Sequence, residues 1–165
     1  MPNNITEDPT TVNDAAPRYT LGDVFQKTIL VSGVPYINKY RYVQFKDAVT
    51  YAAGQSCTWA NATATAVTND RSGGSSIGNQ CAGVALLAVT QNYYGFVQTA
   101  GYHSALVTNG DDDIAAGVPL VVATGTDGAC DSAADPNPSL YFADALAADV
   151  DAANTVAGLI HCLAA

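Results

Sequence analysis

The sequence is poor in basic residues, histidine, methionine and tryptophan. Its 165 residues hold six Lys and Arg against fifteen Asp and Glu, with two His, one Met and one Trp, and the formal net charge is −9. A surface with this balance repels nucleic acid phosphates and anionic membranes. We therefore expect neither a nucleic acid partner nor a membrane partner.

Long apolar runs are also missing. No run approaches the roughly 20 apolar residues that a membrane-spanning helix needs. Residues 1–17 are polar and have neither the basic start nor the apolar core of a secretory signal. The sequence predicts a soluble protein that is made in a cytosol.

Motifs for catalysis, cofactors and metals are lacking as well. The chain offers only His103 and His161 as bases for a hydrolytic triad, and the glycine-bounded stretch around His103 lacks the second glycine and following helix of a nucleophile elbow. The polar loop 69–80 is not followed by a lysine and a helix start, which a phosphate-binding loop needs. Residues 111–113, three aspartates, lack the spacing of a helix–loop–helix calcium site. We expect no enzymatic activity, no cofactor and no metal site.

Four cysteines are widely separated, at Cys57, Cys81, Cys130 and Cys162. No pair has the close spacing of a zinc knuckle or a redox motif. We interpret them as small buried hydrophobic residues in a reducing cytosol. A disulfide between Cys57 and Cys81, on neighbouring strands, is the alternative once the protein leaves the cell.

What the sequence does contain is a series of short apolar runs bounded by glycine or polar residues, a pattern typical of β-strands. The central stretch, 81–110, has three such runs, at 84–89, 96–99 and 102–107. We predict a three-stranded meander, in which 100–101 is the turn between the last two strands.

The remaining chain reads in the same way. Further strands are predicted at 28–34, 40–45, 58–68 and, after a turn, within 114–122, and residues 124–138 are predicted as a polar loop. Residues 140–150 fit either a helix or a strand. We favour a hairpin with 155–163, because 82–86 resembles 156–160. The prediction is an all-β fold with little helix: a small β-barrel or β-sandwich body with an extended N-terminal arm.

Charge divides the chain into two parts. Residues 1–47 hold five of the six bases and five acids, whereas residues 48–165 hold one base, Arg71, and ten aspartates. Residues 1–17 have almost nothing to bury and are predicted to form a flexible arm. The rest is predicted as a single β domain, with an attachment segment at 18–47 and an acidic body at 48–165.

Candidate contact residues come from the attachment segment and are either basic or aromatic. Basic groups pair with acidic groups of a partner, from which the acidic body is repelled. Exposed ion pairs contribute under about 1 kcal/mol each, so aromatic side chains must add affinity. The candidates for contact with a partner or another subunit are Arg18, Tyr19, Phe25, Lys27, Lys39, Tyr40, Arg41, Tyr42 and Lys46. A core poor in large side chains also predicts a homo-oligomer.

Short segments along residues 40–163 carry a resemblance to a known family. They are 42–45 (YVQF), 53–55 (AGQ), 82–86 (AGVAL), 95–102 (GFVQTAGY), 114–120 (IAAGVPL) and 156–159 (VAGL). In this order they resemble the small glycine- and alanine-rich β proteins that decorate or cement the heads of tailed bacteriophages. The resemblance implies a capsid decoration protein on the outer surface of the virion. It further implies binding to the major capsid protein, homotrimers at local three-fold positions, and no cofactor.

A carbohydrate-binding or adhesin-like module is the alternative. Such modules normally present exposed aromatic side chains, and Tyr93, Tyr94 and Tyr102 are the candidates.

Overall fold

The computed structural model describes residues 3–46, 50–71, 80–110, 114–133, 141–149 and 154–162. Strands make up 49% of it, and these residues contain no α-helix. One short 3-10 helix, η1 (Pro9–Thr11), follows Asp8, whose side chain accepts a hydrogen bond from the Thr10 N–H. The expectation of an all-β protein with little helix is therefore confirmed.

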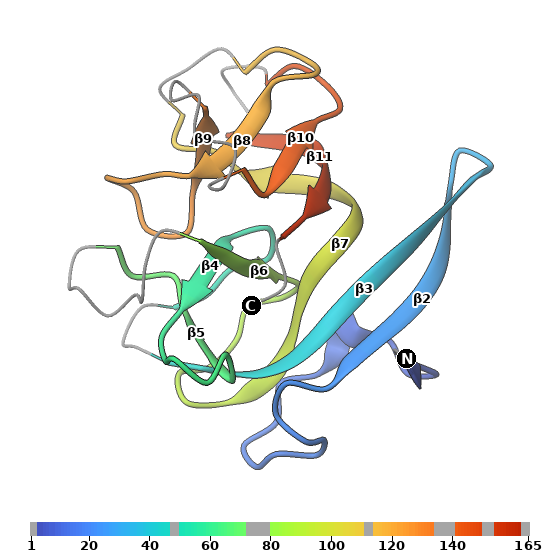
Figure 1. Ribbon diagram of the computed structural model, residues 1–165, viewed down its shortest axis with the longest axis vertical. Coiled ribbons are helices and arrows are strands. Elements are labelled where there is room, and N and C mark those ends of the chain that lie inside the picture. The colour runs from blue at the N-terminus through green and yellow to red at the C-terminus, as the bar shows by residue number, and fades with distance from the viewer. Residues whose placement is uncertain are drawn as a thin grey trace.

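The strands form one large sheet, in the order β1-β2-β3-β5-β4-β6-β7-β11-β10-β8-β9, with an additional pairing between β3 and β7 (Figure 1). Their bounds are β1 (Asn3–Asn4), β2 (Val24–Val31), β3 (Val34–Phe45), β4 (Ser56–Trp59), β5 (Ala66–Thr68), β6 (Cys81–Ala85), β7 (Tyr94–Val107), β8 (Pro119–Val122), β9 (Cys130–Ser132), β10 (Ala143–Ala145) and β11 (Thr155–His161).

Five of these strands pair in a closed cycle. β3 pairs with β5 in parallel, and the antiparallel pairings β5–β4, β4–β6, β6–β7 and β7–β3 return to the first strand. We call β3, β5, β4, β6 and β7 the five-strand ring. From β7 the sheet continues through β11, β10, β8 and β9, and from β3 it continues through β2 to β1.

Buried side chains gather in three clusters. The ring cluster, built around the five-strand ring, contains Val43, Phe45, Tyr51, Cys57, Trp59, Val67, Ala82, Ala85, Val89 and Val97. The N-terminal cluster contains Ile5, Val12, Phe25, Tyr40, Tyr42 and Phe96. The C-terminal cluster contains Cys81, Val84, Leu106, Ile114, Leu120, Val122, Cys130, Phe142, Ala143, Ala145, Val156 and Ile160.

The first residues of the chain pack against this body. β1 pairs in parallel with the start of β2, and the backbones of Asp14 and Tyr94 exchange two hydrogen bonds of 2.9 Å. Ile5 and Val12 are buried in the N-terminal cluster, with 8% and 2% of their surface exposed. The expectation that this segment has almost nothing to bury is wrong for residues 3–17, because its two aliphatic side chains cover the rings of that cluster.

The central meander is also different from the prediction. β7 continues through residues 100–101 without a turn, and β6 ends at Ala85, so two strands stand where three were expected. Gly101 has a φ of +96°, and a Cβ built there would lie 2.7 Å from the carbonyl oxygen of Ile37. Glycine is needed here because β7 passes close to β3, not because the chain reverses.

Three further segments contain turns or strands that the prediction missed. The predicted strand 28–34 is interrupted by a two-residue turn at Ser32 and Gly33, and the predicted strand 58–68 is a hairpin of β4 and β5. Its turn is held by the side-chain oxygen of Asn61, which accepts hydrogen bonds from the Thr65 and Ala66 N–H groups. The predicted polar loop 124–138 contains β9.

The expected hairpin near the end of the chain is confirmed. β10 and β11 are antiparallel, with Ala143 opposite Ile160. Pro119 is the first residue of β8, where proline costs no ladder hydrogen bond. Most of the predicted loop 69–80 lies outside the described residues.

Candidate interaction surface

The far part of the β2–β3 hairpin extends away from the rest of the molecule as a two-stranded ribbon (Figure 1). We call residues 27–38 the distal hairpin. β2 and β3 pair continuously up to Val31 opposite Val34, and Ser32 and Gly33 form the turn with φ angles of +50° and +82°. Two successive residues with positive φ are typical of the tight turn that matches the twist of a hairpin.

Both edges of the distal hairpin lack a strand partner among the described residues. β1 pairs with β2 only at Phe25 and Gln26, and β7 pairs with β3 only from Lys39 onward. An isolated two-stranded hairpin is at best marginally stable in water. Its free edges also present unpaired backbone N–H and C=O groups to other chains.

Large apolar side chains are exposed on this ribbon. Leu30 is 72% exposed, Ile37 59% and Val34 51%, and they are three of the four large exposed hydrophobic residues in the described part of the chain. Leu30 lies opposite Pro35 and Thr28 opposite Ile37, so these four side chains share one face, which we call the Leu30 face. These residues are not among the predicted contact residues, although apolar side chains on both sides of a Ser-Gly pair indicate an apolar hairpin tip.

The base of the hairpin is fixed to β7. The rings of Tyr36 and Tyr102 lie 5.3 Å apart, and the Asn38 side-chain amide donates a 3.0 Å hydrogen bond to the Tyr102 carbonyl oxygen. Gln98 donates to the same oxygen at 2.9 Å. The ribbon therefore starts from a well-defined position and leaves its tip uncovered.

The predicted contact residues divide into exposed and buried groups. Arg18, Lys39 and Lys46 are exposed, and Tyr19, Lys27 and Arg41 are partly exposed. Phe25, Tyr40 and Tyr42 are buried in the N-terminal cluster, where each has at most 7% of its surface exposed. These three belong to the core, in place of the contact role predicted for them, because they pack in that cluster with Ile5, Val12 and Phe96.

Arg18 is engaged within the chain. Its guanidinium forms ion pairs of 2.8 Å with Glu7 and 2.7 Å with Asp14. The Tyr19 hydroxyl donates to Glu7, and this hydrogen bond is the main reason that the pKa of Tyr19 is raised. Arg18 and Tyr19 therefore hold the N-terminal segment onto the body.

The basic residues of the β2–β3 hairpin, in contrast to Arg18, form no ion pair within the described residues. Within the described residues, the ion pairs use Arg18 and His161, so Lys27, Lys39 and Arg41 have no carboxylate within 4.0 Å. Their positive charges are available to an acidic partner.

The two histidines occupy different environments. His103 lies in β7, where burial lowers its pKa to about 4, and its Nδ1 accepts a 3.2 Å hydrogen bond from the Ala105 N–H. At neutral pH this ring is therefore uncharged. His161 is on β11, with Nε2 3.2 Å from the Asp144 carboxylate.

All four cysteines are free thiols. Cys57, Cys81 and Cys130 are buried, as predicted, and Cys162 is half-buried. Burial raises the pKa of Cys130 to about 12, and a hydrogen bond with Cys81 is the main reason that the pKa of Cys162 is raised. The thiols of Cys130 and Cys162 are therefore protonated at neutral pH.

The tyrosines proposed for carbohydrate binding contact different parts of the molecule. Tyr93 packs against the ring cluster, and Tyr94 packs against the N-terminal cluster, where it stacks on Tyr42. Tyr102 packs against Tyr36 at the base of the hairpin.

Residues 111–113 lie outside the described residues. Within the described ranges, no three His, Cys, Asp or Glu side chains are placed to hold a metal ion. No helix in those ranges has the length and apolar character needed to span a bilayer. No protein-family model matches the chain, and no curated protein matches it either.

Proposed function

We propose that this chain is a structural virion protein that decorates a tailed-phage capsid and stabilises it by binding the lattice of the major capsid protein. The observation that carries the proposal is the distal hairpin, which exposes Leu30, Val34 and Ile37 on a ribbon with two free edges. The sequence resemblance described above supports the identity of the partner.

The hairpin is suited to binding a protein surface. Burying an exposed Leu, Val or Ile side chain contributes about 1.5–3 kcal/mol. Leu30 and Ile37 share the Leu30 face and supply a useful contact there, whereas Val34, opposite Val31, lies on the other face. Lys27 and Lys39 add positive charge, whereas residues 48–165 carry one base and ten aspartates and are repelled by an acidic lattice. Contacts of this size become strong when a symmetric shell repeats them.

The proposed architecture follows the predicted one. The closed pairing of the five-strand ring supports a small β-barrel body, and β1 pairing with β2 supports an extended N-terminal arm that lies along that body. We also propose a homotrimer at local three-fold positions on the outer surface, without enzymatic activity or cofactor. Buried alanines in place of larger side chains favour such assembly, because they limit the apolar area that one copy buries.

The test is binding to empty, expanded heads of the tailed phage whose genome carries the gene. We expect the wild-type protein to sediment with the heads and to add density to their outer surface in electron micrographs. The double variant Leu30→Ser, Ile37→Ser removes the apolar contact and is expected to bind at least about tenfold more weakly.

Leu146→Ser is the matched control, because Leu146 is 44% exposed but lies outside the hairpin, after β10. Equal binding by the hairpin variant and the control would refute the role of the hairpin. Absence of added density with wild-type protein would refute capsid decoration. Binding on a glycan array in that case would favour the carbohydrate-binding module.

A further inference from the structure

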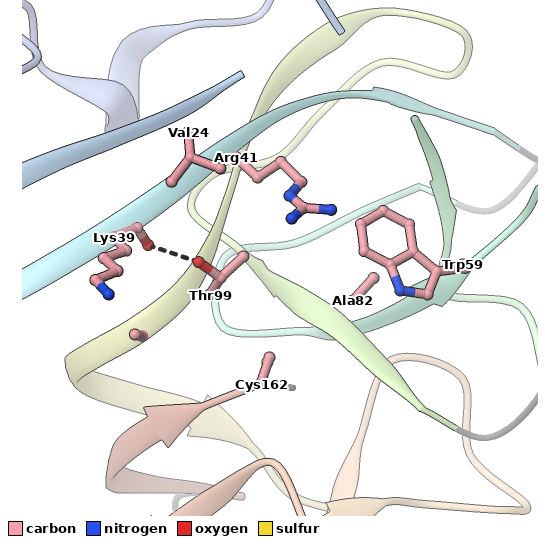
Figure 2. Close-up of a pocket in the computed structure, with 8 residues that line it drawn as sticks. Val24, Lys39, Arg41, Trp59, Ala82, Thr99 and Cys162 are labelled. Atoms are coloured by element: carbon pink, nitrogen blue, oxygen red, sulfur yellow. Dashed lines mark hydrogen bonds between the residues drawn. The ribbon is translucent and has the colours of Figure 1, made fainter. Parts of the chain in front are cut away.

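A small pocket lies at the base of the hairpin, on the same face of the sheet as Leu30. Its volume is about 210 Å³. Lys39 and Arg41 belong to the Leu30 face because they lie opposite Gln26 and Val24 in the alternating register. The lining includes Val24, Lys39, Arg41, Trp59, Ala82 and Thr99 (Figure 2).

The charged groups of this pocket and its indole N–H are hydrogen-bond donors. Figure 2 shows the Arg41 guanidinium reaching from β3 toward Trp59 of β4, and its central carbon lies 5.3 Å from the centre of the indole ring. The Arg41 Nε and the Trp59 Nε1 are buried and have no hydrogen-bond partner among the described residues. Arginine, lysine and tryptophan side chains donate but do not accept. The Thr99 hydroxyl donates a 3.4 Å hydrogen bond to the Lys39 carbonyl oxygen, and no described group accepts from the Arg41 Nε or the Trp59 Nε1.

The Trp59 donor is the more informative of the two. Trp59 is only 6% exposed, and its ring otherwise packs in the ring cluster. A buried N–H without an acceptor is unfavourable, and native proteins rarely leave one unpaired. Because both atoms are buried, an acceptor that enters the pocket pairs with them only when the side chains around them shift.

The charge of the pocket selects an anion. Lys39 and Arg41 both line it. Among the described residues, none that lines it carries a carboxylate, and neither base has an ion pair. Two unpaired cations at one site contrast with the net charge of −9 for the whole chain. A negatively charged ligand would be attracted here and repelled elsewhere.

We propose that the pocket binds a carboxylate carried on a short apolar stem. A planar guanidinium matches the two oxygens of a carboxylate, and the side chains of Val24 and Ala82 suit the stem. The volume is below the roughly 300–1,000 Å³ of pockets for drug-sized ligands, so the site fits one acidic side chain or one small acid. A protein that covers the Leu30 face would bring an acidic side chain to this position, but the site does not depend on capsid binding.

Trp59 gives a direct readout because it is the single tryptophan of the chain. In the full-length ¹⁵N-labelled protein, its indole N–H gives one resonance. We expect butyrate and N-acetyl-glutamate N-methylamide to shift this resonance saturably, with a dissociation constant on the order of 1 mM. Butyramide, the neutral analogue of butyrate, is expected to leave it in place.

Two variants test the basic groups. Arg41→Gln is expected to weaken binding of butyrate at least about tenfold, and Lys39→Gln, at an exposed position, is expected to weaken it without affecting folding. Lys27→Gln is the matched control, since Lys27 lies opposite Asn38 on the other face of the hairpin. Far-ultraviolet circular dichroism checks that each variant is folded.

The outcomes separate the sources of the carboxylate. A shift with the blocked glutamate supports the proposal with a partner side chain as ligand, and a shift with butyrate alone supports it with a free acid as ligand. An equal shift with butyramide or with inorganic phosphate would overturn the carboxylate assignment. So would the absence of any shift up to about 50 mM, or an unchanged affinity in Lys39→Gln and Arg41→Gln.

Discussion

The distal hairpin and the five-strand ring share β3 but differ in what covers their side chains. In the ring part of β3, Val43 and Phe45 are fully buried, whereas Ile37, on the hairpin part, is 59% exposed. The change occurs at Lys39, where β7 begins to pair with β3. Apolar residues therefore make both parts a strand, but the neighbouring strands decide which part is core and which part is surface.

The largest loss of stability is expected from removing an aromatic side chain from the core. Phe96 is fully buried, and its ring lies 5.5 Å from that of Phe25 and 5.1 Å from that of Tyr42. Phe96→Ala should lower the free energy of unfolding by about 3–5 kcal/mol, through lost burial and the cavity left behind. Ile37→Ala should change it by less than about 0.5 kcal/mol. Urea denaturation measures the free energy of unfolding of both variants. A similar loss in the two would contradict the difference between the buried core and the exposed hairpin.

The free energy of unfolding is expected to fall in acid, because His103 lies at the boundary between the distal hairpin and the five-strand ring. His103 lines a hollow with Lys27, Asn38 and Tyr40 at the base of the hairpin, and burial lowers its pKa from 6.5 to about 4. Between these values the unfolded chain binds more protons than the folded chain, so stability falls as the pH falls from 6.5 to 4. The slope is at most about 1.4 kcal/mol per pH unit, which gives a total of about 3 kcal/mol.

Denaturation series at several pH values measure this slope. His103→Asn should reduce it, because the asparagine has no titrating group in this range. Ser104→Ala is the control, since Ser104 is the neighbouring exposed residue and does not titrate there. Equal slopes in wild type and His103→Asn would mean that water reaches the hollow and that the hairpin base is open.

The N-terminal segment is expected to behave as part of the core. Val12 is 2% exposed and packs in the N-terminal cluster, and its carbonyl oxygen would lie 2.7 Å from a Cβ at Gly95. Val12→Ala should lower the free energy of unfolding by about 1.5–3 kcal/mol. Thr10→Ala is a control in the same segment, at an exposed position. Equal thermal denaturation midpoints for Val12→Ala and Thr10→Ala would instead indicate that residues 3–17 are a loosely attached arm.

Local sequence patterns predicted the strands well and the connections poorly. Apolar runs locate most of β3 and β8, whereas the β10–β11 hairpin is favoured over a helix only because 82–86 resembles 156–160. The sequence predicts a turn at Gly101, because a glycine at positive φ serves equally for a reversal and for a close passage of two strands. Only the long-range pairing of β7 with β3 distinguishes these cases.

The candidate site was predicted only in part, for a related reason. Charge alone identified Lys27, Lys39 and Arg41, which the structure leaves without ion pairs in its described residues. Trp59 was not selected, because its approach to Arg41 joins two strands that are not hydrogen-bonded neighbours in the sheet. Aromatic content pointed to Tyr40 and Tyr42, but burial of a side chain depends on the chain that covers it.

The smallest effect is expected from alanine substitution of two glycines that have the same backbone conformation, one in each region. This comparison separates the two regions most directly. Gly33, at the hairpin tip, has a φ of +82°, and Gly117, before β8, has a φ of +85°; a Cβ at either would meet nothing within 4 Å. Alanine at each position should therefore cost only the backbone strain, about 1 kcal/mol. Gly117 lies in the body, where its N–H donates a 2.7 Å hydrogen bond to the Ala145 carbonyl oxygen, so Gly117→Ala should lower the free energy of global unfolding. In Gly33→Ala the strain should be released when the distal hairpin opens by itself, which would speed hydrogen exchange of its amides about fivefold, whereas Gly117→Ala should leave the exchange of these amides unchanged. If Gly117→Ala instead speeds exchange of the hairpin amides as much as Gly33→Ala does, the hairpin unfolds together with the ring, and its exposed side chains belong to one cooperative unit with the core.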